Sequence, residues 1–195
     1  MDKDVLVPRP DTELIVEEVL KMYSKNSQKQ ILDIGTGSGC ILLSIIKERP
    51  NFYGTGIDIS KKSIKISKFN TKQLNLINRV KFFHSSVDNF RFGKYDLIVS
   101  NPPYIELLNL KYLDKNVINF EPKLALNGGF DGFSKIREFV TKAKTLIKRK
   151  GKFILEIGFN QKNKVKGILE DEGFYINKAI KDYGNNDRCI ISTKI

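Results

Sequence analysis

Three alternating glycines stand between a short apolar run and a helical pattern. The run 30–34 (QILDI) is typical of a buried strand, and 40–47 (CILLSIIK) is typical of a helix. Between them lie Gly35, Gly37 and Gly39. Glycine has no Cβ, so the backbone can approach a ligand closely here, and the helix N-terminus offers free N–H donors. The segment therefore predicts a strand–turn–helix unit with a ligand site at the turn.

The same alternation of strands and helices continues along the chain. Apolar strands that alternate with helices indicate a mostly parallel sheet covered on both faces. The last two strands have no helix between them, which indicates an antiparallel edge. We therefore expect an α/β fold with a seven-stranded, mostly parallel sheet, an antiparallel edge strand and helices on both faces. The other predicted strands are 52–58, 80–84, 95–100, 153–157, 174–180 and 188–194, and the other predicted helices are 60–74, 133–148 and 161–171.

Sheets of this kind bind ligands outside the carboxyl ends of the strands, where the strand order reverses. We therefore expect the loops after the first, second and fourth strands to form the site. The glycine loop is not a dinucleotide-binding fingerprint, because the sixth position counted from Gly35 is Cys40. It is not a Walker A loop either, because no Gly-Lys-Ser or Gly-Lys-Thr ends it.

Asp58 ends the second strand and follows the glycine loop in the chain. An acidic side chain at this place can accept hydrogen bonds from two ribose hydroxyls. The alternatives are a cap for the following helix, for which Ser60 is also a plausible residue, or a solvated loop acid. The pairing with the glycine loop favours the ribose interpretation.

The fourth strand ends in the tetrapeptide Asn101-Pro102-Pro103-Tyr104. Its two prolines fix φ and remove two backbone donors, so the loop is rigid and presents acceptors. The side-chain oxygen of Asn101 and the carbonyl of Pro102 can both accept from one NH₂ group of a carboxamide or a base. Such a nitrogen is a poor nucleophile, and two acceptors can aim it at an electrophile, with Tyr104 packed on the planar group. The alternative is an ordinary proline turn.

The amino-acid composition limits the class of protein, its compartment and its partners. The chain has 195 residues, a formal net charge of +12 and 41% hydrophobic residues, which fits one folded domain and excludes a disordered chain. We find no apolar run near the ~18 residues of a membrane span, no signal peptide, and only two cysteines. We expect a monomer without a membrane partner, in the cytoplasm or alternatively an organelle matrix. The positive charge suits a nucleic acid or an acidic protein surface as partner. The alternative is that the lysines, which are scattered along the chain, reflect only its general amino-acid composition.

Taken together, these residues resemble the HemK/PrmC family, the protein-(glutamine-N5) methyltransferases that modify peptide chain release factors. The similarity runs over nearly the whole chain. The tetrapeptide is shared with DNA adenine methyltransferases, and the segments around Arg9 and Glu121 narrow the choice. The matching segments are 7–13 (VPRPDTE), 31–39 (ILDIGTGSG), 101–104 (NPPY), 121–132 (EPKLALNGGFDG) and 155–158 (LEIG).

The resemblance implies a class I S-adenosyl-L-methionine (SAM) methyltransferase fold, which is Rossmann-like. It implies SAM as cofactor, S-adenosyl-L-homocysteine as product, and N5-methylation of the glutamine in the Gly-Gly-Gln loop of class 1 release factors. The transfer is expected to be direct, without a covalent enzyme intermediate. Only seven residues precede Pro8, so we expect 1–195 to be a single catalytic domain without the helical docking domain that family members usually carry there.

The resemblance also assigns roles to residues. The glycine loop and the strand-end acids are expected to hold SAM, and the tetrapeptide is expected to bind the target amide. The cofactor-binding residues are Asp33, Gly35, Thr36, Gly37, Gly39, Asp58 and Asn101. The catalytic residues are Asn101, Pro102 and Tyr104, and the substrate-binding residues are Asn101, Pro102, Pro103, Tyr104, Arg9, Thr12 and Glu121. No metal is expected, because no cluster of Cys, His and acidic residues has ligand spacing.

One departure and two alternatives stay open. Where the family has an acid near the adenine, this chain has Ser86, with Asp88 two residues on, so a backbone amide can serve instead. The charge and the tetrapeptide also suit an amino-group methyltransferase of DNA or RNA, but we find no recognition region for base flipping. The second alternative is a non-catalytic binding module with the SAM fold. The intact glycine loop, the acidic residue Asp58 and the intact tetrapeptide argue against it.

Overall fold

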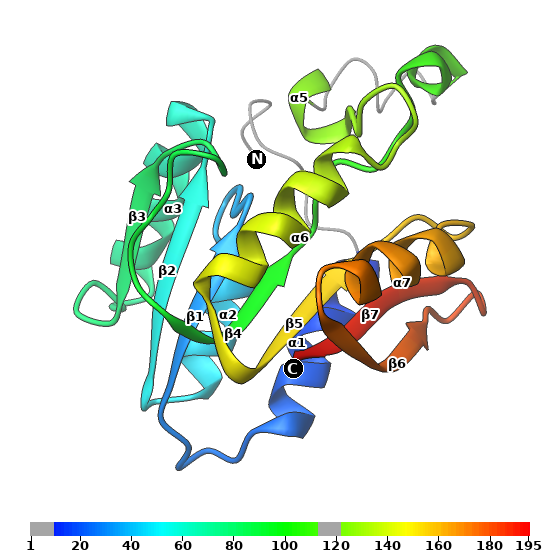
Figure 1. Ribbon diagram of the computed structural model, residues 1–195. Coiled ribbons are helices and arrows are strands. Elements are labelled where there is room, and N and C mark those ends of the chain that lie inside the picture. Colours follow the sequence, from blue (N-terminus) through cyan, green and yellow to red (C-terminus); the bar gives the residue numbers. More distant parts are fainter. Residues whose placement is uncertain (1–9, 113–121) are drawn as a thin grey trace.

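Seven strands form one sheet in the computed structural model, which describes residues 10–112 and 122–195 (Figure 1). They are β1 (Lys29–Ile34), β2 (Phe52–Asp58), β3 (Val80–His84), β4 (Tyr95–Ser100), β5 (Ile147–Glu156), β6 (Phe174–Lys181) and β7 (Asp187–Lys194). Their order across the sheet is β3-β2-β1-β4-β5-β7-β6.

The strand directions confirm the expected sheet. β1 pairs in parallel with β2 on one side and with β4 on the other, so the strand order reverses at β1. β7 runs antiparallel to both β5 and β6 and makes the antiparallel edge region together with β6. The reversal places the loops after β1 and β4 beside each other, where a ligand crevice is expected.

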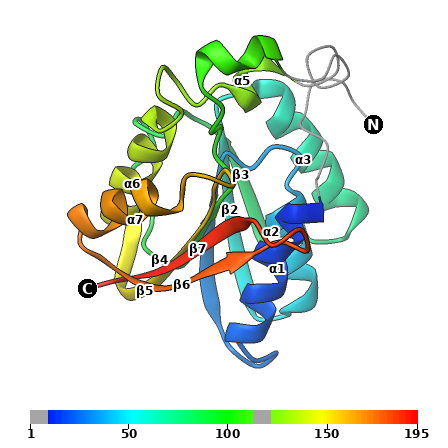
Figure 2. The same ribbon diagram turned by 90° about the vertical axis from the view of Figure 1, so that its right-hand side faces the viewer.

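Helices cover both faces of the sheet, as Figure 2 shows from the side. One face carries α1 (Pro10–Met22), α2 (Cys40–Glu48) and α3 (Lys61–Gln73), and the other carries α6 (Ser134–Leu146) and α7 (Lys162–Asp171). The short η1 (Leu107–Tyr112) and α5 (Lys123–Leu126) follow β4 in the chain. No helix among the described residues is long and apolar enough to cross a membrane.

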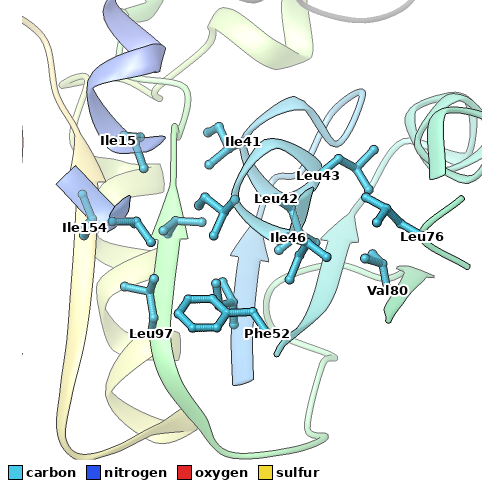
Figure 3. Close-up of a cluster of buried hydrophobic side chains, with 14 of the residues drawn as sticks. Ile15, Ile41, Leu42, Leu43, Ile46, Phe52, Leu76, Val80, Leu97 and Ile154 are labelled. Atoms are coloured by element: carbon cyan, nitrogen blue, oxygen red, sulfur yellow. The ribbon is translucent and has the colours of Figure 1, made fainter. Parts of the chain in front are cut away.

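Successive strand residues alternate between two hydrophobic cores, as the pleat of a strand requires. Ile31 and Leu97 pack with Leu42 in the core under α1 and α2. Figure 3 shows this core, with Leu42 and Leu97 labelled. Leu32 and Ile98 pack in the core under α6 and α7. Both faces of the central strands are therefore buried, which explains their near-continuous apolar sequence.

Two boundaries differ from the sequence prediction by more than one residue. The helix predicted for 133–148 ends at Leu146, because Ile147 is already extended with φ −80° and ψ 143°. Strand β5 therefore begins at Ile147, six residues earlier than the predicted strand 153–157. The exposed Lys148, Arg149 and Lys150 look like a helix end in sequence but form the solvated start of this strand.

Candidate active site

A cavity of about 290 Å³ lies outside the carboxyl ends of β1, β2, β3 and β4. This volume is close to the lower end of small-molecule sites. The loops after these four strands form its wall together with α5, α6 and Thr12 of α1. The loops after β1, β2 and β4 thus meet where the sequence placed a ligand site. The polar side chains of the wall include Thr12, Thr36, Asp58, Ser86, Asn101 and Glu138.

The glycine loop after β1 needs its glycines for backbone conformation. Gly35, Gly37 and Gly39 have φ of 74°, 56° and 81°, a region that other residues rarely adopt. The amides of Gly35 and Thr36 both donate to the carbonyl of Ile57 over 2.9 Å. The loop is therefore fixed to the end of β2, and its backbone forms the cavity wall without Cβ atoms in the way.

Asp33 lies behind this loop and does not line the cavity. It is fully buried, and its Oδ2 accepts a 2.6 Å hydrogen bond from the Thr36 hydroxyl, whereas Oδ1 has no hydrogen-bond partner among the described residues. Burial raises the pKa of Asp33 to about 7, with Asp58 adding to the effect and the Thr36 hydroxyl opposing it. Thr36 does line the cavity, so Asp33 reaches the site only through this neighbour.

Asp58 lines the cavity at the end of β2. Its Oδ2 accepts from the Gly37 amide over 2.9 Å, and its Oδ1 accepts from the Ser60 amide over 2.7 Å. Burial raises the pKa of Asp58, and these two amides oppose the rise. Ser60 is the N-cap of α3, as the sequence suggested, because its hydroxyl accepts from the Ser63 amide.

The loop after β3 forms the next part of the wall. Both Ser86 and Asp88, the two residues considered for a contact with adenine, line the cavity. The hydroxyl of Ser86 accepts from the Asn89 amide over 3.3 Å. Lys142 of α6 fixes the loop from behind, since its Nζ donates to the carbonyls of Asp88 and Phe90, each over 3.0 Å.

The tetrapeptide after β4 lies between two cavities. Asn101 and Pro103 line the main cavity. Asn101 also lines a second cavity of about 20 Å³, with Pro102, Tyr104 and Glu156. The carbonyl of Tyr104 accepts a 3.0 Å hydrogen bond from the buried Gln161, so the loop is held from the C-terminal half of the chain.

The structure brings most of the predicted residues together, but not all of them. Neither Asp33 nor Gly39 lines a cavity: Asp33 holds Thr36 from behind the loop, and Gly39 is the last residue of the loop and the N-cap of α2. Arg9 and Glu121 lie outside the described residues. Around the main cavity lie Thr12, Gly35, Thr36, Gly37, Asp58, Asn101 and Pro103, and around the smaller one lie Asn101, Pro102 and Tyr104.

Sequence reasoning missed several residues of the site. Lys135, Glu138 and Phe139 of α6 line the main cavity, but in sequence they are only part of an amphipathic helix. Glu156 was noticed only as part of a matching segment, although it is 1% exposed and lies at the end of β5. Gln161 carries no signal beyond its place as the first residue of the predicted helix 161–171, and in the structure it is the N-cap of α7.

Solved structures with the same fold include methyltransferases. A methyltransferase from Pyrococcus furiosus matches with a TM-score of 0.71 and 21% identity, over 97% of this chain and 85% of that chain. A magnesium protoporphyrin IX methyltransferase from Synechocystis, solved with bound SAM, matches with a TM-score of 0.67 and 15% identity, over 94% of this chain and 78% of that chain. The fold is therefore that of the class I SAM-dependent methyltransferases, as expected.

Sequence comparison narrows this class to one family. The family described as "Methyltransferase small domain" matches residues 10–121. Curated relatives named "Release factor glutamine methyltransferase" include those of Caulobacter vibrioides (37% identical, covering all of this chain and 68% of the relative) and Clostridium acetobutylicum (39%, all of this chain and 69% of the relative). That of Fusobacterium nucleatum is 42% identical, and the chain spans 55% of its length. This chain belongs to the release factor glutamine methyltransferase family, whose cofactor is SAM.

Proposed function

We propose that this chain methylates the side-chain nitrogen N5 of a glutamine in the Gly-Gly-Gln loop of class 1 peptide chain release factors, with SAM as the methyl donor. The observation that carries the proposal is the place of Asn101, which lines both cavities. A cofactor in the main cavity and a carboxamide beside the smaller one would meet at this residue. The names of the relatives support the choice of a release-factor glutamine as the target.

The residues of the main cavity fit SAM. At Gly35 and Gly37 the cavity wall is backbone without side chains. Each carboxylate oxygen of Asp58 accepts a hydrogen bond from one amide, which leaves a lone pair on each oxygen for a ribose hydroxyl. When bound, SAM supplies a methyl group on a sulfonium, whose carbon–sulfur bonding pair returns to sulfur as the target nitrogen forms the new carbon–nitrogen bond. The negative charge of Asp58 suits such a cationic ligand.

The tetrapeptide suits a carboxamide as the methyl acceptor. In the proposal, Asn101 Oδ1 and the Pro102 carbonyl accept the two N–H groups of the target amide. The nitrogen gains positive charge as its new bond forms, so both hydrogen bonds strengthen in the transition state. The proton then leaves to water. Tyr104 packs on the plane of the amide, and Gln161 fixes the backbone that carries it.

Other parts of the expected function remain predictions. We propose that 1–195 act as one catalytic domain and that the chain works as a monomer in the cytoplasm. We also propose that Arg9 and Glu121, which lie outside the described residues, take part in binding the substrate. The alternative of a DNA or RNA acceptor is an outcome of the experiment that follows.

Mass spectrometry tests the proposal directly. The protein is incubated with SAM and a purified release factor, and the intact mass of the release factor is measured. We expect one added methyl group, which fragmentation places on the glutamine of the Gly-Gly-Gln loop. A release factor with alanine at that position is the control and stays unmodified. Methylation of a DNA or RNA oligonucleotide, with an unmodified release factor and measured SAM binding, would contradict the proposal.

A further inference from the structure

A chain of three side chains leads from Asn101 into the protein interior. The Asn101 Nδ2 donates to the Thr12 hydroxyl over 3.2 Å, and this hydroxyl donates to Glu156 Oε2 over 2.9 Å. Thr12 is 6% exposed and Glu156 is 1% exposed. The three residues come from α1, the loop after β4 and the end of β5, so the fold brings them together from distant parts of the sequence.

The chemistry of these three side chains fixes the direction of the hydrogen bonds between them. The Thr12 hydroxyl gives its only proton to Oε2 of Glu156. The hydroxyl oxygen can then only accept from Asn101. Asn101 must therefore turn its NH₂ group toward Thr12, which leaves its carbonyl oxygen for a ligand.

We propose that Thr12 and Glu156 are positioning residues that make the site select a carboxamide over a carboxylate. This inference rests on the proposed function, because the carboxamide is the target glutamine. A carbonyl oxygen presented by Asn101 accepts from the NH₂ group of glutamine. Glutamate offers only acceptors at the same place, so two acceptors face each other and both stay unpaired.

The small cavity lies directly beside these hydrogen bonds. Glu156 lines it together with Asn101, Pro102 and Tyr104. The hydrogen bonds from Asn101 to Thr12 and from Thr12 to Glu156 also increase the electron density on the Asn101 oxygen, since successive hydrogen bonds polarise one another.

Binding of two matched release factors tests the proposal. The first carries the natural glutamine in its Gly-Gly-Gln loop, and the second carries glutamate there. Their dissociation constants are measured by calorimetry in the presence of S-adenosyl-L-homocysteine, which prevents turnover. For the unchanged protein we expect clear preference for the glutamine form. Thr12→Val keeps the side-chain shape but removes the hydroxyl, and we expect it to reduce this preference about tenfold, the lower end of what loss of an outer hydrogen bond costs in metal sites.

Two further variants separate orientation from folding. Thr12→Ser restores the hydroxyl and is expected to restore the preference. Glu156→Gln can donate as well as accept, so both directions of the chain become possible, and the preference is expected to fall as well. Melting temperature and the affinity for S-adenosyl-L-homocysteine report on folding for each variant.

The outcomes distinguish this inference from the proposed function. If the unchanged protein neither binds nor methylates the glutamine form, the proposed function fails. If it does both, but Thr12→Val weakens the two forms equally and leaves their ratio unchanged, Thr12 has a structural role only and the inference is wrong. A lower ratio in Thr12→Val that Thr12→Ser restores supports it.

Discussion

The amide of Gly37 donates a hydrogen bond of 2.9 Å to Oδ2 of Asp58, which joins the glycine loop to the end of β2 at the cavity wall. The other oxygen of Asp58 accepts from the Ser60 amide over 2.7 Å at the start of α3. One carboxylate thus sets the relative position of two loops and of a helix. Its orientation is fixed before any ligand arrives, which is the arrangement that precise binding requires.

We predict that Asp58→Asn weakens SAM binding. An amide must turn its NH₂ group toward either Gly37 or Ser60, and a donor then faces a donor. Loss of one charge-assisted hydrogen bond and of the negative charge lowers SAM affinity about ten- to a hundredfold. Calorimetric titration with SAM measures this. Asp171→Asn, at the exposed end of α7, is the matched control and leaves the affinity unchanged. Equal affinity in both variants would remove Asp58 from the binding site.

Asp33 is predicted to make stability depend on pH. Its pKa is raised from 3.8 to about 7, so the folded protein keeps this proton at a higher pH than the unfolded chain. Its contribution to the free energy of unfolding therefore falls as the pH rises through this range and stays low above it. Asp33→Asn removes the ionisation. We expect its stability relative to the unchanged protein to increase between pH 5 and pH 8, measured by urea unfolding. A difference that does not change with pH would contradict the account.

Gly56 of β2 has no room for a side chain. An added Cβ would lie 2.4 Å from Phe82 and 2.9 Å from the Thr36 hydroxyl. We predict that Gly56→Ala lowers the free energy of unfolding by about 1–3 kcal/mol through overpacking, and that it weakens SAM binding through Thr36. Gly167→Ala in α7 is the control, because nothing lies within 4 Å of its added Cβ. That change stabilises the helix by about 0.5–1 kcal/mol.

Lys142 is predicted to support the loop after β3. It is 6% exposed, and burial together with the charge of Arg91 lowers its pKa. Lys142→Met removes both hydrogen bonds to the loop carbonyls, so we expect a loss of about 1–3 kcal/mol in stability and weaker SAM binding. Lys144→Met breaks a surface pair with Glu172 at 2.8 Å and is expected to change stability by less than about 1 kcal/mol. Denaturant unfolding and SAM titration compare the two. Equal effects would show that Lys142 does not support the site.

The sheet could be predicted from the sequence because local signals agreed with one another. Strands β2, β3 and β4 begin and end at the predicted residues, and the glycine loop and Asn101 meet at the predicted edge of the sheet. Apolar runs and glycine turns depend on nearby residues, so one sequence is enough to recognise them. The start of β5 was misplaced because a run of lysines is compatible with either a helix end or a solvated strand.

The contacts in the site that the sequence does not predict are those between residues far apart in the chain. Thr12 and Glu156 are 144 positions apart, and neither has a local pattern that points to the other. Gln161 reaches Tyr104 across 57 positions. Asp33 was expected at the ligand, but the strand pleat turns it into the interior, where it touches Thr36. Such pairings follow from the strand order and register, which the sequence pattern leaves open.

The most direct test of the account is methyl transfer by Asn101→Ala under single-turnover conditions, with saturating SAM and the natural release factor. We predict that the rate of transfer to glutamine falls on the order of a hundredfold or more, as when one transition-state hydrogen bond is removed, even when SAM saturates the variant. Unchanged melting temperature confirms that the variant is folded. Transfer at the full rate by this folded variant would contradict the central claim that Asn101 holds the target amide.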